Sequence, residues 1–437
     1  MAEAQMTTSS IPLATVPAAS TSGHYARPLA VVTTLFFMWG FLTSLNDILV
    51  PHLKSIFDLG YAQAMLIQFA FFSAYFVFSI PWSRIVNTIG YQRTMVAGLL
   101  SMAVGAFLFV PAASTASFAL FLGALIVLAA GITGLQVAAN PYVVVLGNSE
   151  TASSRLDLVQ AFNSLGTTIA PLFGGLLILS ASPLAIEELR RLSPDALQLY
   201  RIGTAASVKM PYIVIGLALV LLAFLIGASK LPAIERAKQA TGTLGDSVWK
   251  HPNLVFAAIG IFAYVGAEVS IGSFLVNYLE QADIAALSAK TAAGYVSFYW
   301  GGAMVGRFLG AALLRRIKTG HLLAICAVCA GLLVTISMLT DGNTAMWSIL
   351  AVGLFNSIMF PTIFSLGAAE LGPLTPTGSG MLNMAIVGGA VLPLMQGAIA
   401  DRVGIHHAFF VPVICYAYIL FFALSGSRPN SERYARA

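Results

Sequence analysis

The chain alternates between long apolar stretches and short polar segments along almost its whole length. Each apolar stretch is long enough for a helix to cross a hydrocarbon core of about 30 Å. The alternating ten-residue strands that are typical of membrane barrels are absent. The pattern predicts an all-α integral membrane protein with twelve transmembrane helices, near residues 29–51, 62–82, 94–112, 117–146, 156–180, 211–231, 253–279, 291–313, 321–340, 344–367, 378–400 and 407–425.

The composition agrees with a membrane protein. Hydrophobic residues make up 58% of the chain and charged residues 9%, whereas soluble proteins average about 25% charged residues. The net charge of +5 comes from Lys and Arg in the loops, so it carries information on topology and does not indicate a nucleic-acid partner.

A charged segment between the sixth and seventh spans divides the chain into two halves. The predicted organisation is a disordered cytoplasmic tail (1–27), an N-terminal six-helix half (28–231), a cytoplasmic linker (232–252), a C-terminal six-helix half (253–425) and a cytoplasmic tail (426–437). With this arrangement the side of the termini carries twice as many Lys and Arg residues as the other side. The positive-inside rule then predicts that both termini are cytoplasmic.

The two halves share short sequence patterns at nearly one offset. Gly166–Gly175 and Gly388–Gly397 both read G-x4-P-L-x-x-G, 222 residues apart, and Pro141 and Pro361 lie 220 residues apart in corresponding spans. These repeats favour a duplicated six-helix unit of the major facilitator type, in which substrate binds near the midplane between the halves.

Asp47 is the most informative single residue, because it lies inside the first apolar stretch. A charged side chain at the bilayer centre costs roughly 3 kcal/mol on insertion scales, so such residues usually face a bundle interior or a water-filled cavity. Glu268 is the other clear carboxylate in the middle of a span, and no histidine occupies such a position. The two acids are therefore the predicted proton-coupling residues. Sodium coupling stays open, although lone acids on separate helices fit protons better.

Amide side chains gather in several spans and often share a helical face. Asn and Gln both donate and accept hydrogen bonds, as a neutral sugar requires, although they also bridge membrane helices for stability. Arg307 is the one basic residue near mid-span, either at depth or snorkelling toward Arg315, and a gating role for it is left open. The predicted substrate-binding residues are Gln136, Asn140, Gln160, Asn163, Asn356 and Asn383.

No metal site, organic cofactor or enzyme constellation is predicted. Cys326 and Cys329 form a C-x-x-C inside an apolar segment, where small packing residues are the better interpretation. The proton is the only expected coupling ion.

Four motifs resemble the fucose–galactose–glucose:proton symporter family of the major facilitator superfamily. They are Leu45–Pro51 (LNDILVP), Gln136–Tyr142 (QVAANPY), Gln160–Gly166 (QAFNSLG) and Tyr264–Phe274 (YVGAEVSIGSF). The resemblance implies a sugar permease of the bacterial inner membrane that works by alternating access. In this comparison Asp47 matches the coupling aspartate, and Gln160 and Asn163 match sugar-cavity residues. In the fucose symporter an acid stands where this chain has Gln136, and an amide does not titrate.

That difference favours the glucose/galactose or N-acetylglucosamine branch of the family. The predicted function is proton-coupled import of a neutral hexose of the glucose/galactose class. The alternatives are an N-acetylglucosamine or L-fucose permease of the same family and, less favoured, a drug or metabolite exporter. The expected partners are the sugar, protons and the lipid bilayer, and the expected state is a monomer. Our further hypothesis is that Glu268 orders the C-terminal half.

Overall fold

The computed structural model describes residues 25–57, 61–177, 192–232 and 247–428. All of the regular elements in these ranges are helices. Ten helical segments in them are long and apolar enough to cross a membrane, and the more polar α5 and α10 complete the twelve. The fold class predicted from the sequence is confirmed.

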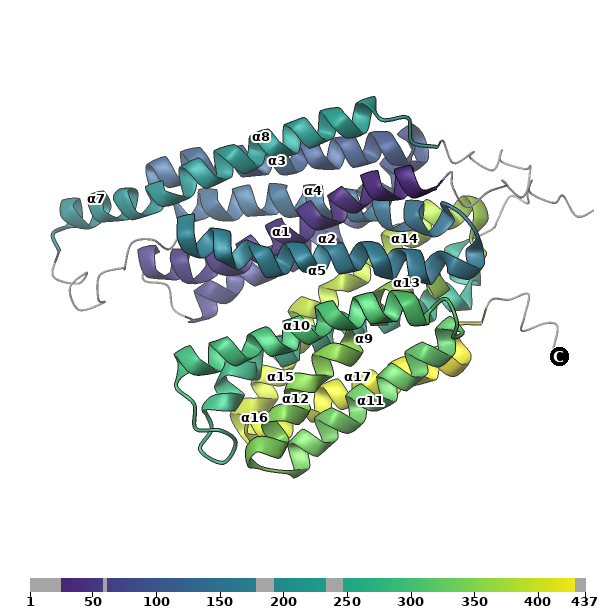
Figure 1. The fold of residues 1–437 in the computed structure, drawn as a ribbon. Helices are drawn as coiled ribbons and strands as arrows, with labels where there is room; N and C mark the ends of the chain where they lie inside the picture. The colour runs from purple at the N-terminus through teal and green to yellow at the C-terminus, as the bar shows by residue number, and fades with distance from the viewer. Residues whose placement is uncertain (1–24, 58–60, 178–191, 233–246, 429–437) are drawn as a thin grey trace, which may run out of the picture.

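The N-terminal half forms the upper part of Figure 1 and the C-terminal half the lower part. The first half contains α1 (Ala26–Phe57), α2 (Tyr61–Ile89), α3 (Tyr91–Thr115), α4 (Phe118–Val145), α5 (Ala152–Leu177), α7 (Pro194–Ala205) and α8 (Lys209–Ala228). The second contains α9 (Pro252–Glu280), α10 (Ala289–Leu313), α11 (Thr319–Leu339), α12 (Gly342–Asn356), α13 (Met359–Gly367), α14 (Thr375–Met384), α15 (Gly388–Val403), α16 (Ile405–Ala408) and α17 (Phe410–Phe421).

Several predicted spans consist of more than one helix. The tenth comprises α12 and α13, and the eleventh comprises α14 and α15 joined by a 3-10 turn at Ala385–Val387. Residues 194–208 lie between the fifth and sixth predicted spans (156–180 and 211–231), where the prediction implies a loop. They are helical and continue into α8, so the prediction is wrong for these residues. The start signal is local: Ser193 accepts a hydrogen bond from the Ala196 amide, and Pro194 and Asp195 follow in the first turn. The predicted tails 1–27 and 426–437 and linker 232–252 lie largely outside the described residues, so those boundaries stay predictions.

The repeated glycine of the two halves has the same packing role in each. A methyl group at Gly166 on α5 would collide with the Phe37 carbonyl on α1, and one at Gly388, at the start of α15, would collide with the Phe262 carbonyl on α9. Small residues let membrane helices approach at the backbone level. The sequence repeat therefore corresponds to a repeated close helix contact.

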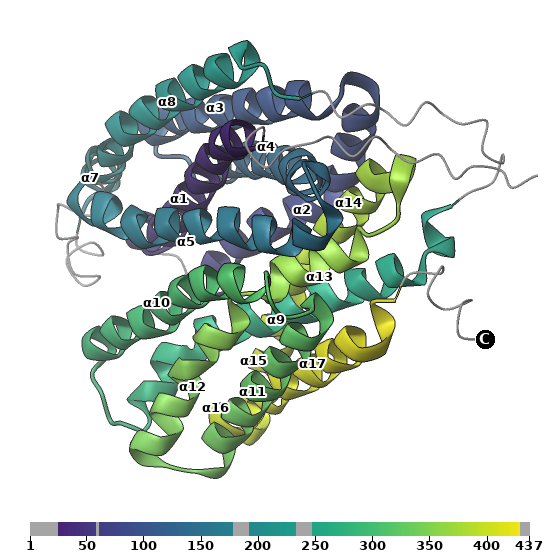
Figure 2. The same cartoon turned by 45° about the vertical axis from the view of Figure 1, so that its right-hand side comes forward.

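The halves meet at one end of the molecule, which we call the linker end: the end where α1, α5 and α9 begin. In Figures 1 and 2, α13 and α14 lie among α2, α4 and α5 at this end. Ser153 of α5 shares a 2.6 Å hydrogen bond with Ser365 of α13, and Asn87 donates to Thr377 at 3.3 Å. Polar contacts between the halves thus gather at the linker end. We call the opposite end the far end.

Candidate functional site

The predicted coupling residue Asp47 lies on α1, in the part of the helix nearer the far end. The side chains of residues 45–56 are outside the described part of the chain. The role of Asp47 therefore stays a prediction.

The predicted amides of the N-terminal half are buried between α1, α2, α4 and α5. Gln136 donates to the Tyr75 hydroxyl at 2.9 Å, and Asn163 donates to the Phe36 carbonyl of α1 at 2.9 Å. Asn140 is fully buried, and neither its amide nitrogen nor its oxygen has a hydrogen-bond partner. Since buried polar groups are normally paired, Asn140 holds hydrogen-bonding capacity that the protein itself does not use.

In the C-terminal half, too, one predicted amide has all of its recorded hydrogen bonds within the protein and another keeps an unpaired atom. Asn356 donates to the Tyr299 hydroxyl and accepts from the Tyr416 hydroxyl, both at 2.8 Å, so its side chain is committed to the protein. Asn383 donates to the Ser379 carbonyl at 2.9 Å, but its oxygen has no partner. Asn356 therefore has a structural role in this conformation, whereas Asn383 retains a free acceptor.

Glu268 lies next to the Asn356 network. Its carboxylate accepts a 2.7 Å hydrogen bond from Tyr264 one turn earlier on α9, and its backbone carbonyl accepts from Tyr299 at 3.5 Å. The positive charge of Arg307 also acts on this carboxylate. Glu268 thus contacts Tyr264 of α9 and Tyr299 of α10. Its roles in proton coupling and in ordering the C-terminal half stay predictions.

Arg307 on α10 points into the protein and does not snorkel toward Arg315. Its Nε donates to the Ser357 carbonyl at 3.2 Å, and its Nη1 donates to the Gln160 carbonyl at 3.4 Å and to the Ser164 hydroxyl. Gln160 and Ser164 belong to α5 of the other half. Arg307 therefore connects the predicted sugar-site helix α5 with the C-terminal half.

Prolines explain two free backbone acceptors, one inside α4 and one at the junction of α12 and α13. Proline lacks an amide hydrogen, so it leaves the carbonyl four residues earlier without its helical donor. Pro361 leaves the Ser357 carbonyl free, and Arg307 donates to it. Pro141 leaves the Val137 carbonyl free, and Ser379 of the other half donates to it at 3.1 Å. The repeated prolines thus create backbone acceptors that side chains from other helices satisfy.

Asp157 is a buried carboxylate that the sequence analysis missed. The prediction placed the start of span five at 156 and so left Asp157 at a helix end, but α5 begins at Ala152 and holds Asp157 inside the contact with α10. The side chain is 0% exposed, and neither oxygen has a hydrogen-bond partner. The spacing Asp157, Gln160, Ser164 places it on the same face as two polar contact residues, and this spacing was the available signal.

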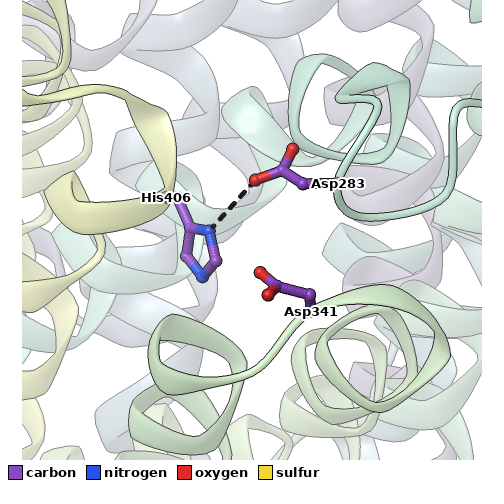
Figure 3. Close-up of side chains that lie close together, drawn as sticks. All are labelled: Asp283, Asp341 and His406. Atoms are coloured by element: carbon purple, nitrogen blue, oxygen red, sulfur yellow. Dashed lines mark ion pairs between the residues drawn. The ribbon is translucent and has the colours of Figure 1, made fainter.

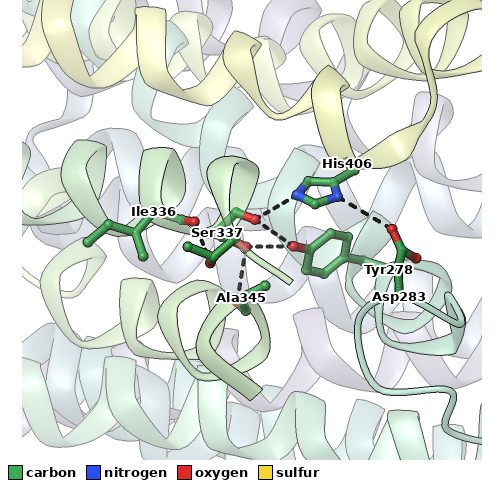
Figure 4. A network of polar contacts seen from close by, with 7 residues as sticks. Tyr278, Asp283, Ile336, Ser337, Ala345 and His406 are labelled. Atoms are coloured by element: carbon green, nitrogen blue, oxygen red, sulfur yellow. Dashed lines mark hydrogen bonds and ion pairs between the residues drawn. The ribbon is translucent and has the colours of Figure 1, made fainter. Parts of the chain in front are cut away.

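A second polar cluster lies at the far end of the C-terminal half. Asp283, Asp341 and His406 each offer a ligand atom within 4.8 Å of the others (Figure 3). His406 Nε2 lies 2.8 Å from the Ser337 carbonyl, to which Tyr278 donates at 2.9 Å, and Nδ1 lies 3.8 Å from Asp283 (Figure 4). The Asp283 side chain is 58% exposed, so water solvates its charge, and its contact with His406 joins the turn after α9 to α16. The cysteines 326, 329 and 415 are free thiols on helices.

Comparison with known proteins gives one consistent result. The family model of the Major Facilitator Superfamily matches residues 31–392. The chain is 53% identical to the glucose/galactose transporter of Brucella abortus over 94% of this chain and 96% of that protein. It is 36% identical to the L-fucose-proton symporter of Escherichia coli over 93% of this chain and 94% of that one.

A solved structure extends the likeness to three dimensions. The crystal structure of the transporter FucP in the outward conformation matches with a TM-score of 0.85 at 35% identity, and covers 92% of this chain and 99% of that one. The relatives are transporters, so the expectation that this chain is a multi-pass transporter and not an enzyme is confirmed. The chain belongs to the Major Facilitator Superfamily and, within it, to the fucose–galactose–glucose:proton symporter family.

Proposed function

We propose that the protein imports a neutral hexose of the glucose/galactose class together with a proton, by alternating access. The observation that carries this proposal is the 53% identity to a glucose/galactose transporter across nearly the whole chain. The L-fucose-proton symporter, at 36% identity, supports an L-fucose permease as the second candidate.

The amide chemistry supports a sugar over a charged or purely apolar substrate. Asn140 and Asn383 keep unused amide atoms in the interior, and sugar hydroxyls can both donate to and accept from such groups. Gln136 stands at the position where the fucose branch carries an acid. Its amide nitrogen donates a hydrogen bond to the Tyr75 hydroxyl. An amide there is compatible with sugar binding and takes no part in proton transfer, which favours the glucose/galactose assignment.

Proton coupling is assigned to Asp47 first and Glu268 second. Protonation removes the charge from a carboxylate, so a proton that arrives at Asp47 lowers the cost of closing the far end over it. Glu268 is held by a hydrogen bond from Tyr264 and lies near the positive charge of Arg307. These partners stabilise its ionised form, which is the reason that Glu268 comes second to Asp47 as the proton carrier. The sugar and the proton then favour the same occluded state, and their coupling is reciprocal.

We place the protein in a bacterial inner membrane as a monomer, with the linker end facing the cytoplasm. The excess of Lys and Arg on the side of the termini supports this orientation. Contacts between the halves at the linker end then correspond to a conformation closed toward the cytoplasm. The related structure in the outward conformation supports the same assignment.

The test is uptake of radiolabelled sugars by proteoliposomes with an imposed proton gradient. The panel contains glucose, galactose, N-acetylglucosamine, mannose and L-fucose, each with and without a protonophore and with a sodium gradient as control. We expect accumulation of glucose and galactose that the protonophore abolishes. Accumulation of L-fucose or N-acetylglucosamine alone would support the second candidate, and accumulation under sodium alone would contradict proton coupling.

A further inference from the structure

We infer that Asp157 is a proton-binding residue at the contact between α5 and α10, protonated while the linker end is closed and ionised when the two halves separate there. This inference rests on the proposed proton-driven transport. It adds a carboxylate on α5 to the coupling residues Asp47 and Glu268.

Asp157 lies between two hydrogen bonds that join the halves. One turn before it, the Ser154 hydroxyl donates to the Ala311 carbonyl of α10 at 2.6 Å. One turn after it, the Gln160 carbonyl accepts from Arg307 of α10 at 3.4 Å. Asp157 therefore faces α10 from the middle of the contact that must break when the linker end opens.

Gly310 is the residue of α10 that leaves room for the carboxyl group. A methyl group at Gly310 would lie 2.6 Å from Oδ2 of Asp157 and would also collide with Ile358. The glycine thus lets α10 close directly over the acid. In this closed arrangement Asp157 is 0% exposed, and water does not reach it.

The charge state follows from this burial. An ionised carboxylate without hydrogen-bond donors is far more costly to bury than the neutral acid. Among the described side chains, the titratable or charged groups that act on Asp157 from neighbouring helices are the Arg307 guanidinium of α10 and the Cys326 thiol of α11. The Nε and Nη1 donors of Arg307 are directed to Ser357, Gln160 and Ser164. Asp157 receives no hydrogen bond from Arg307 or from any other group. The closed contact therefore favours the protonated acid.

Separation of α5 and α10 reverses this preference. Once α10 moves away, water solvates Asp157, and the acid releases its proton toward the linker end. Because the linkage is reciprocal, a low proton concentration on that side favours the open state.

The test measures opening at the linker end directly. The full-length protein, with Cys326, Cys329 and Cys415 replaced by serine, is labelled with spin labels at Glu150→Cys and Arg316→Cys, two exposed positions beside α5 and α10. Distances are recorded by double electron–electron resonance in nanodiscs, without sugar, across a pH series. Linkage of one proton to opening predicts that the open-to-closed ratio rises by up to about tenfold per pH unit.

Two non-titrating variants and one control make the result specific. Asp157→Asn and Asp157→Ala should abolish the pH dependence, and the asparagine variant should stay closed. Ser154→Ala removes the neighbouring hydrogen bond but keeps the acid, so it should retain the pH dependence. Persistence of the background pH dependence in either Asp157 variant, or a background without any pH dependence, would overturn the inference.

The outcome is independent of the sugar assignment. Glucose and galactose counterflow, measured on the same labelled protein, reports the proposed function by itself. If counterflow is absent while the distances respond to pH through Asp157, the sugar proposal fails and the Asp157 inference stands. The opposite pair of results leaves the sugar proposal in place and removes Asp157 from the coupling mechanism.

Discussion

Arg307 on α10 donates a 3.4 Å hydrogen bond to the backbone carbonyl of Gln160 on α5. This bond connects the C-terminal half to the Gln160–Gly166 motif, whose first and fourth residues match sugar-cavity residues of the family. The same guanidinium also binds the Ser357 carbonyl and the Ser164 hydroxyl. Three acceptors from two halves meet one planar cation, and an arginine fork suits this arrangement better than a lysine ammonium does.

We expect Arg307→Lys to reduce sugar counterflow by about tenfold to a hundredfold. The lysine keeps the charge but loses at least one charge-assisted hydrogen bond of about 1.5–3 kcal/mol. The measurement is counterflow in proteoliposomes. The matched control is Arg315→Lys, the same exchange at an exposed position just after the C-terminal end of α10. This variant should transport normally. Normal counterflow by Arg307→Lys would show that the fork geometry does not matter.

Pro361→Ala tests the origin of the acceptor at Ser357. Alanine restores the amide hydrogen that proline lacks, and this hydrogen can return to the Ser357 carbonyl and compete with Arg307. We expect slower counterflow without loss of thermal stability, because alanine is the better helix former. Pro111→Ala, inside α3 away from the contact between the halves, should leave counterflow unchanged. Equal effects of the two substitutions would reject the explanation.

Asn356→Ala and Asn140→Ala should separate structural amides from substrate-binding amides. Asn356→Ala removes two hydrogen bonds and leaves the Tyr299 and Tyr416 hydroxyls without them, so we expect a loss of about 2 kcal/mol in unfolding free energy. The Asn140 side chain makes no hydrogen bond within the protein. Its substitution should leave thermal unfolding nearly unchanged but weaken galactose binding by about tenfold or more. Calorimetry of unfolding and of galactose binding checks both results, and the reverse pattern would contradict them.

Asp47→Asn should separate exchange from accumulation. Counterflow needs no net proton movement, so sugar exchange should continue, while accumulation driven by the proton gradient should disappear. Glu268→Gln is the comparison, because the amide can still accept from Tyr264, and we expect it to retain part of the accumulation. Full accumulation by Asp47→Asn would show that Asp47 is not the obligatory carrier.

The sequence by itself determined the fold class. Apolar stretches of membrane-spanning length are a local property of the chain, and the repeats at Gly166 and Gly388 and at Pro141 and Pro361 showed that the chain consists of two related units. The helical segment before α8 was missed because the long-range apolar pattern was weak there, although Ser193 and Pro194 gave a local start signal.

Only the tertiary structure decided which polar side chains already form hydrogen bonds within the protein. The sequence treats Asn140 and Asn356 alike, yet the packing of α10, α12 and α17 commits Asn356 to two tyrosines and leaves Asn140 without a partner. The sequence likewise shows Asp157 only as an acid near a predicted helix start, on the same face as Gln160 and Ser164. Its burial depends on the approach of α10 at Gly310, a contact between residues more than 150 positions apart, and no local pattern encodes such a contact.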